Sequence, residues 1–166
     1  MSLCLAAVAA AAAAPAAVER GTIVVNRGAH GVALGMTRKQ VLARLGRPIY
    51  ENKNGYMQYA RVGRGTIFDV YLDLHTKRVR LLSISGRKFC TREHVCLMRK
   101  GGVATAQAAY GRSLHAIADE DGTPAYVIYG RLRGRSVFTT FEAEHNPQAQ
   151  IFQLFVGFCN GPCPGR

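Results

Sequence analysis

Four cysteines in two closely spaced pairs are the side chains whose type and spacing point most directly to chemistry. Cys90 and Cys96 flank His94, and Cys159 and Cys163 flank a short turn. A structural zinc site needs four ligands, and no second pair lies at a zinc-finger spacing. The second pair has three intervening residues, so it lacks the thioredoxin-type motif. Among the three possible pairings we favour two local disulfides, Cys90–Cys96 and Cys159–Cys163. A metal site or free thiols at the first pair are the alternatives.

Sequence signatures of catalysis are missing. The chain has no nucleophile-elbow pattern, no glycine-rich phosphate loop and no His-Glu-x-x-His zinc motif. A catalytic triad would be recognisable only in the fold, because its members lie far apart along a chain. We therefore expect no enzymatic activity, no cofactor and no metal. A small secreted hydrolase is the alternative from a different functional class.

The first residues resemble an export signal. Residues 1–17 carry no charge and are almost all Ala, Leu and Val, and Ala14-Pro15-Ala16 gives a small-x-small cleavage pattern. The run is shorter than the roughly 20 residues of a membrane span. We expect a secretory signal peptide at residues 1–16, with an uncleaved Ala-rich helix as the alternative. The mature chain would be secreted, periplasmic or in the cell envelope, with only peripheral membrane contact.

A strong positive charge limits the expected partners. Lys and Arg number 22 against 10 Asp and Glu, which gives a formal charge of +12. Such a surface attracts anionic molecules. We expect a monomer that binds a protein or an anionic envelope polymer, and nucleic acid is the least expected partner of an exported chain. The alternative is that the charge only keeps the protein soluble.

A short helix with clear start and stop signals follows at residues 37–46. Thr37 can cap it, and Gln40 is placed to complete a capping box. Met36 and Val41 have the spacing of a hydrophobic staple. Gly46 can take the left-handed exit conformation, and Pro48 prevents the helix from continuing.

Strand patterns follow this helix. Residues 56–61 are rich in aromatic residues, residues 66–75 alternate between apolar and polar, and residues 79–85 complete a predicted meander. The pattern then recurs at an offset of 70, at which Tyr56, Tyr59, Arg61, Phe68 and His75 match Tyr126, Tyr129, Arg131, Phe138 and His145. This recurrence predicts a tandem duplication. The first copy would span residues 17–89, and a degenerate second copy, with a weaker helix at 104–110, would span 90–166.

The helix motif also resembles a known group of exported proteins. Gly35-Met36-Thr37, Gln40-Val41 and Leu45-Gly46-Arg47-Pro48 are similar to the pattern of the SmpA/OmlA and β-lactamase-inhibitory-protein group. The resemblance implies an α+β fold of two units, each a short helical hairpin packed on an antiparallel sheet, with a concave sheet surface. It also implies binding in the cell envelope, or inhibition of a secreted enzyme such as a β-lactamase. The chain has no Trp, and Cys4 comes too early for a lipoprotein signal.

Two sets of residues are therefore candidates for binding. Aromatic anchors on the concave face would come from Tyr56, Tyr59, Tyr71, Tyr126, Tyr129 and Phe141. Tyr56 and Tyr59 must face opposite ways on a strand. A basic patch would come from equivalent turns that the two copies bring to one edge, with Arg61, Arg64, Arg131, Arg133 and Arg135. The alternatives are core tyrosines and solvated turn tips. The sequence thus predicts an exported, non-enzymatic binding protein.

Overall fold

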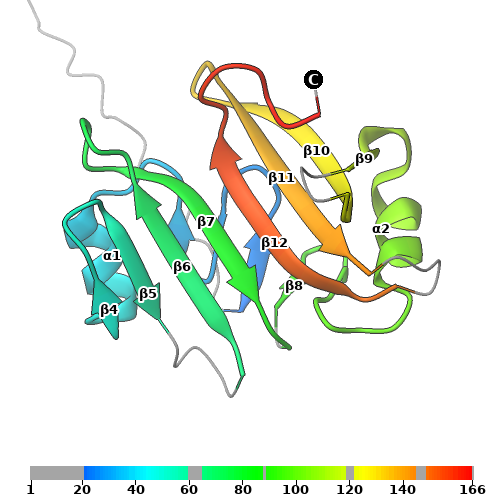
Figure 1. Cartoon of the computed structure of the whole chain (residues 1–166), viewed down its shortest axis with the longest axis horizontal. Helices are drawn as coiled ribbons and strands as arrows, with labels where there is room; N and C mark the ends of the chain where they lie inside the picture. Colours follow the sequence, from blue (N-terminus) through cyan, green and yellow to red (C-terminus); the bar gives the residue numbers. More distant parts are fainter. Residues whose placement is uncertain (1–20, 60–64, 88, 119–121, 145–148, 166) are drawn as a thin grey trace, which may run out of the picture.

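The computed structural model describes residues 21–59, 65–87, 89–118, 122–144 and 149–165. Two sheets and two α-helices make up this part of the chain (Figure 1). The expected signal peptide at residues 1–16 lies outside the described residues, as do Arg61, Arg64 and His145. No helix within the described ranges is both long enough and apolar enough to cross a membrane.

An eight-stranded antiparallel sheet dominates the molecule. Its strand order is β4-β5-β6-β7-β12-β11-β10-β9, so each half of the chain contributes four neighbouring strands. The bounds are β4 (Tyr50–Glu51), β5 (Tyr56–Tyr59), β6 (Ile67–Leu72), β7 (Val79–Ser85), β9 (His115–Ala118), β10 (Pro124–Leu132), β11 (Arg135–Ala143) and β12 (Ile151–Phe158). The predicted strand at 79–85 is confirmed as β7, and the alternating run at 66–75 contains β6. The two halves join where β7 pairs with β12.

A small sheet and the helices pack on one face of this large sheet. The small sheet has the order β3-β2-β1-β8, formed by β1 (Thr22–Val24), β2 (Gly28–Ala29), β3 (Val32–Ala33) and β8 (Cys90–Thr91). Helix α1 (Arg38–Leu45) has the predicted capping box of Thr37 and Gln40. Helix α2 (Gly102–Tyr110) contains the expected 104–110 segment and continues into the short 3-10 turn η1 (Gly111–Ser113).

The predicted α+β fold of two helical hairpins on sheets is wrong. The described chain is mostly β, and each half supplies one α-helix. In the first half, the residues before α1 form β1, β2 and β3, because the β-branched run Thr22–Val24 favours strand. The close pairing of β2 and β3 depends on Gly28, since a Cβ built there would lie 2.1 Å from the Val32 carbonyl oxygen.

The core lies between the large sheet and these covering elements. Alternate residues of β6, Phe68, Val70 and Leu72, point into it, as the period-two pattern predicts. From the other half, Phe141, Leu154 and Val156 join the same cluster, together with Val41 of α1. The opposite face of the large sheet carries Tyr56, Tyr71 and their neighbours and contributes none of these buried side chains, so we call it the open face.

The strand registers correct the alignment of the two halves. At the offset of 70, Tyr59 matches Tyr129, yet Tyr59 points into the core and Tyr129 lies on the open face. An offset of 71 residues between β6 and β11 aligns core-facing residues with core-facing residues, for example Val70 with Phe141. A one-residue slip reverses every side chain, and this explains the conflict of faces in the sequence pattern. The duplication itself stays a prediction.

Removal of the Thr37 hydroxyl tests the cap of α1. We expect Thr37→Ala to lower the free energy of unfolding by about 1 kcal/mol, because the Gln40 amide then loses its acceptor. Urea unfolding of the oxidised protein measures this loss. Thr37→Ser is the matched control, since it keeps the hydroxyl and should retain most of the stability. An equal loss in both variants would mean that the cap is not the cause.

Candidate binding surface

Three tyrosines gather on the open face of β4, β5 and β6, and we call Tyr50, Tyr56 and Tyr71 the tyrosine patch. Tyr50 is opposite Gln58 and Tyr56 is opposite Tyr71 in the strand pairing, so all of them share one face. The ring centroids of Tyr50 and Tyr56 are 5.9 Å apart, and those of Tyr56 and Tyr71 are 5.1 Å apart. Tyr50 is 53% exposed, whereas the other two are half-buried.

Hydrogen bonds hold the centre of the patch in place. The Tyr56 hydroxyl donates to Asp69 Oδ1 at 3.1 Å, and Gln58 Nε2 donates to the same hydroxyl at 2.8 Å. Burial and the hydrogen bond to Asp69 raise the pKa of Tyr56 to about 12. Burial also raises the pKa of Asp69, against the effect of the hydrogen bonds from Tyr56 and Gln58. The patch is therefore pre-arranged before any partner binds.

Helix α1 fixes the edge strand that carries Tyr50. Arg38 donates from Nε and Nη2 to the two carboxylate oxygens of Glu51, at 2.6 and 2.7 Å. The hydrogen bond from Arg38 lowers the pKa of Glu51. Glu51 and Tyr50 are neighbours on β4 and point to opposite faces, so this ion pair anchors the strand from the core side.

An open hollow of about 820 Å³ adjoins the patch, at the end of the sheet where β6 turns into β7. Tyr56 and Tyr71 form one side, and Asp73, His75 and Arg80 lie along the rest. Arg80 is placed here by a register shift between β6 and β7, at which Tyr71 pairs with Leu81 but Leu72 pairs with Val79. The extra residue of such a bulge has no partner, which lets its side chain turn to the open face.

The C-terminal segment packs over the open face at β9 and β10. The Tyr129 hydroxyl donates to the carbonyl oxygen of Pro164, and a Cβ at Gly165 would touch Ile117 of β9. Ala125 and Val127 of β10 are buried although they lie on the open face. The tyrosine patch lies on a part of the open face that the described C-terminal segment does not cover.

The predicted aromatic residues lie in different environments. Tyr56 and Tyr71 meet on the open face, but Tyr59 is 4% exposed and Phe141 is fully buried in the core. Tyr126 packs against the core, and Tyr129 lies beneath the C-terminal segment. The structure adds Tyr50, Asp69 and Arg80 to the candidate surface. Asp69 was detectable in the sequence, because it has the same strand parity as Tyr71.

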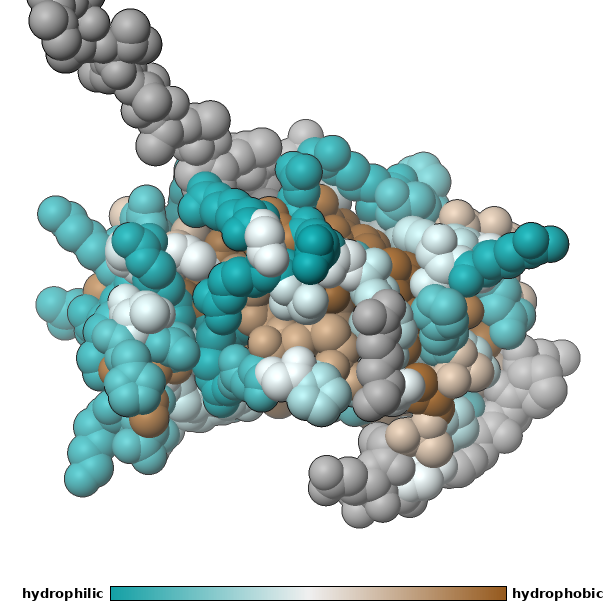
Figure 2. Space-filling model, turned by 90° about the horizontal axis from the view of Figure 1, so that it is seen from above, coloured by the Kyte–Doolittle hydropathy of each residue, from teal (hydrophilic) through white to brown (hydrophobic). Residues whose placement is uncertain are grey.

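Of the predicted basic turns, the structure places the second, because Arg61 and Arg64 of the first lie outside the described residues. Since β6 and β11 run in opposite directions, β5 ends and β6 begins at one end of the sheet, whereas the turn from β10 to β11 is at the other. Arg131, Arg133 and Arg135 lie at this second end, and the β6–β7 turn with Lys77 and Arg78 is at the same end of the sheet. Figure 2 views the molecule from this end and shows hydrophilic side chains projecting there. The Arg135 guanidinium also lies 3.9 Å from the centre of the Phe158 ring.

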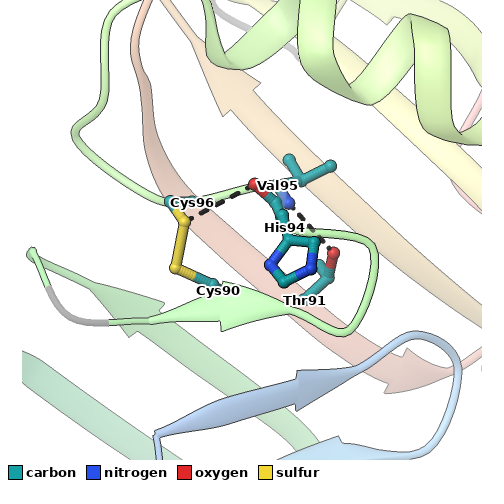
Figure 3. The surroundings of a disulfide bond; sticks show 5 residues. All are labelled: Cys90, Thr91, His94, Val95 and Cys96. Carbon is teal, nitrogen blue, oxygen red and sulfur yellow. Dashed lines mark hydrogen bonds between the residues drawn. A yellow bond between two sulfur atoms is a disulfide. The ribbon is translucent and has the colours of Figure 1, made fainter.

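Both predicted disulfides, Cys90–Cys96 and Cys159–Cys163, are present. Figure 3 shows the first, where Val95 N donates to Thr91 Oγ1 within the hairpin that the bond closes. The thiolates that a zinc ion would need are consumed in the bond. Disulfides of this kind are typical of an oxidising, extracellular compartment. Within the described ranges, no cluster of three or more His, Cys, Asp or Glu is arranged to hold a metal.

No known protein family, characterised protein or solved structure matches this chain.

The two aspartates near the hollow should respond oppositely to pH. Burial raises the pKa of Asp69 in the folded protein above its ordinary value of 3.8. The folded state therefore holds this proton more tightly than the unfolded chain, and ionisation of Asp69 at higher pH makes the fold less stable. Backbone and side-chain hydrogen bonds from Thr76 lower the pKa of Asp73, which stabilises the fold above that pH and is lost in acid. We expect Asp69→Asn to gain stability at pH 7 relative to the native protein, and Asp73→Asn to lose it.

Urea unfolding at pH 7 and at about pH 3 checks both signs, with Asp73→Asn as the control for loss of one negative charge. Both differences should shrink at the lower pH, where the native carboxylates become protonated. A loss of stability in Asp69→Asn at pH 7 would show that the hydrogen bond from Tyr56 outweighs the burial of the charge.

Proposed function

We propose that this chain is an exported, non-enzymatic binding protein, and that it recognises a protein partner through the tyrosine patch on the open face of the eight-stranded sheet. The observation that carries the proposal is the arrangement of Tyr50, Tyr56 and Tyr71. The ring of Tyr56 contacts those of Tyr50 and Tyr71, and its hydroxyl is fixed by Asp69 and Gln58.

Tyrosines of this kind suit protein recognition. A tyrosine ring gives a large contact area and loses little conformational entropy on binding, and its hydroxyl can hydrogen-bond at the edge of the contact. The cost of ordering is lower still for Tyr56, because its side chain is already held by two hydrogen bonds. The rigid β-sheet beneath keeps the three rings at fixed positions.

The positive charge of the protein favours an acidic partner. The net charge is +12, and Arg131, Arg133 and Arg135 are at the same end of the sheet as the hollow beside Tyr71. A positive potential next to a recognition surface speeds the encounter with an anionic partner and is screened by salt. In this proposal the charge steers the partner, and the tyrosines bind it.

The proposal also places the protein outside the cytoplasm. The two disulfides fit an oxidising compartment, and the uncharged, Ala-rich start of the sequence fits a signal peptide. The proposed site of action is the cell envelope or the extracellular space. The resemblance to envelope and inhibitory proteins agrees with this and stays a prediction.

A capture experiment with matched variants tests the function. Immobilised, oxidised protein is mixed with envelope and secreted fractions of the producing organism at low and high salt. We expect one acidic protein to be retained at both salt concentrations. Tyr71→Ala should weaken the affinity of this partner by about thirtyfold, as for a binding hot spot of about 2 kcal/mol. The dissociation constant of the captured partner is then measured with each variant.

Lys39→Ala, on the exposed side of α1, is the control and should bind like the native protein. Retention of mixed anionic material only at low salt, with no effect of Tyr71→Ala, would contradict the proposal. If the captured partner is a hydrolase, an assay of its activity with and without the protein separates inhibition from simple binding.

A further inference from the structure

A second cavity lies on the open face, beneath the C-terminal segment. Its volume is about 580 Å³, which is in the range of small-molecule sites. The sheet forms the floor, β9 forms one wall, and the C-terminal segment with its Cys159–Cys163 disulfide forms the roof. A roofed pocket suits a small molecule better than a protein surface, which needs a broad and accessible area.

The walls of this cavity are largely apolar. Leu81, Phe138 and Phe155 line the floor, Ile117 lines the wall, and Pro162 and Pro164 line the roof. Gly157 lets two of these side chains pack closely over β12, because a Cβ there would lie 2.7 Å from Leu81 Cδ1 and 2.9 Å from Phe138 Cζ. Aromatic rings pack well against other aromatic rings, so the body of a matching ligand is flat and apolar.

Arg80 supplies a positive charge at one end of the cavity. Arg80 is half-buried there, and its guanidinium makes no hydrogen bond or ion pair with the residues that the structure describes. Glu142 lines the other end. It lies four residues along β11 from Phe138, which shares a row of the sheet with Leu81, so the two charges are about 13 Å apart along the strands.

The floor also contains an unpaired hydroxyl. Thr140 is 7% exposed, and its Oγ1 has no hydrogen-bond partner in the described part of the chain. Such a group costs free energy until it finds a partner. Thr140 lies between Phe138 and Glu142 on the same face of β11, in the middle of the cavity floor.

We propose that this cavity binds a small aromatic carboxylate, with the ring between Phe138 and Phe155 and the carboxylate on Arg80. This cavity adjoins the tyrosine patch at Arg80, which also lines the hollow beside Tyr71, and the proposal does not depend on the partner protein. A bidentate contact to a planar guanidinium is the geometry that a carboxylate prefers.

Calorimetric titration of the oxidised protein tests the site with two probes, 2-naphthylacetate and its neutral analogue 2-naphthylacetamide. We expect one molecule of the carboxylate to bind per chain, about tenfold tighter than the amide, because only the carboxylate pairs with Arg80. Arg80→Gln should remove this preference and leave binding of the amide unchanged. Phe155→Ala should weaken both probes.

Arg112→Gln, on η1, is the control for the loss of one positive charge and should keep the preference. The proposal is overturned if neither probe binds in a saturable one-to-one manner, or if the carboxylate keeps its advantage in Arg80→Gln. It is also overturned if Arg112→Gln loses the preference, because net charge would then explain the effect. Near-UV circular dichroism confirms that each variant is folded.

Discussion

The pairing of β7 with β12 is the interaction on which the rest of the structure depends. Five residue pairs, from Gln153 with Ser85 to Gly157 with Leu81, join the two halves into one sheet. The Gln153 side chain also donates to Ser83 Oγ at 3.0 Å across this joint. Because the sheet is continuous, the small sheet and both helices can share one core, and the other face becomes a single surface.

This open face has two parts with different chemistry, which meet at Arg80. On one side lies the tyrosine patch, where α1 holds β4 through Arg38 and Glu51. On the other side, the C-terminal segment forms a roof and leaves a cavity above Phe138 and its neighbours. Arg80 lines the hollow of the first part and the cavity of the second, because the bulge between β6 and β7 turns it to this face.

Local signals in the sequence predicted the features that local interactions determine. The Thr37 capping box, the strand at 79–85 and the two short disulfide loops depend on residues close together in the chain. The small sheet could not be predicted in this way, since β1 pairs with β8, which lies 68 residues further on. The direction of each strand also depends on the antiparallel joint, which puts the end of β5 and the turn from β10 to β11 at opposite ends of the sheet. The face of each aromatic side chain likewise follows from the strand register, which puts Tyr56 on the open face and Phe141 in the core.

Hydroxyl-radical footprinting of the protein, alone and with its captured partner, tests most directly whether the open face is the recognition surface. Mass spectrometry measures the oxidation rate of each tyrosine. We expect the partner to slow the oxidation of Tyr50, Tyr56 and Tyr71 several-fold, while the oxidation of Tyr110 of α2, on the covered side of the sheet, is unchanged. Protection confined to α1 and α2, with unchanged oxidation of the tyrosine patch, would contradict this expectation.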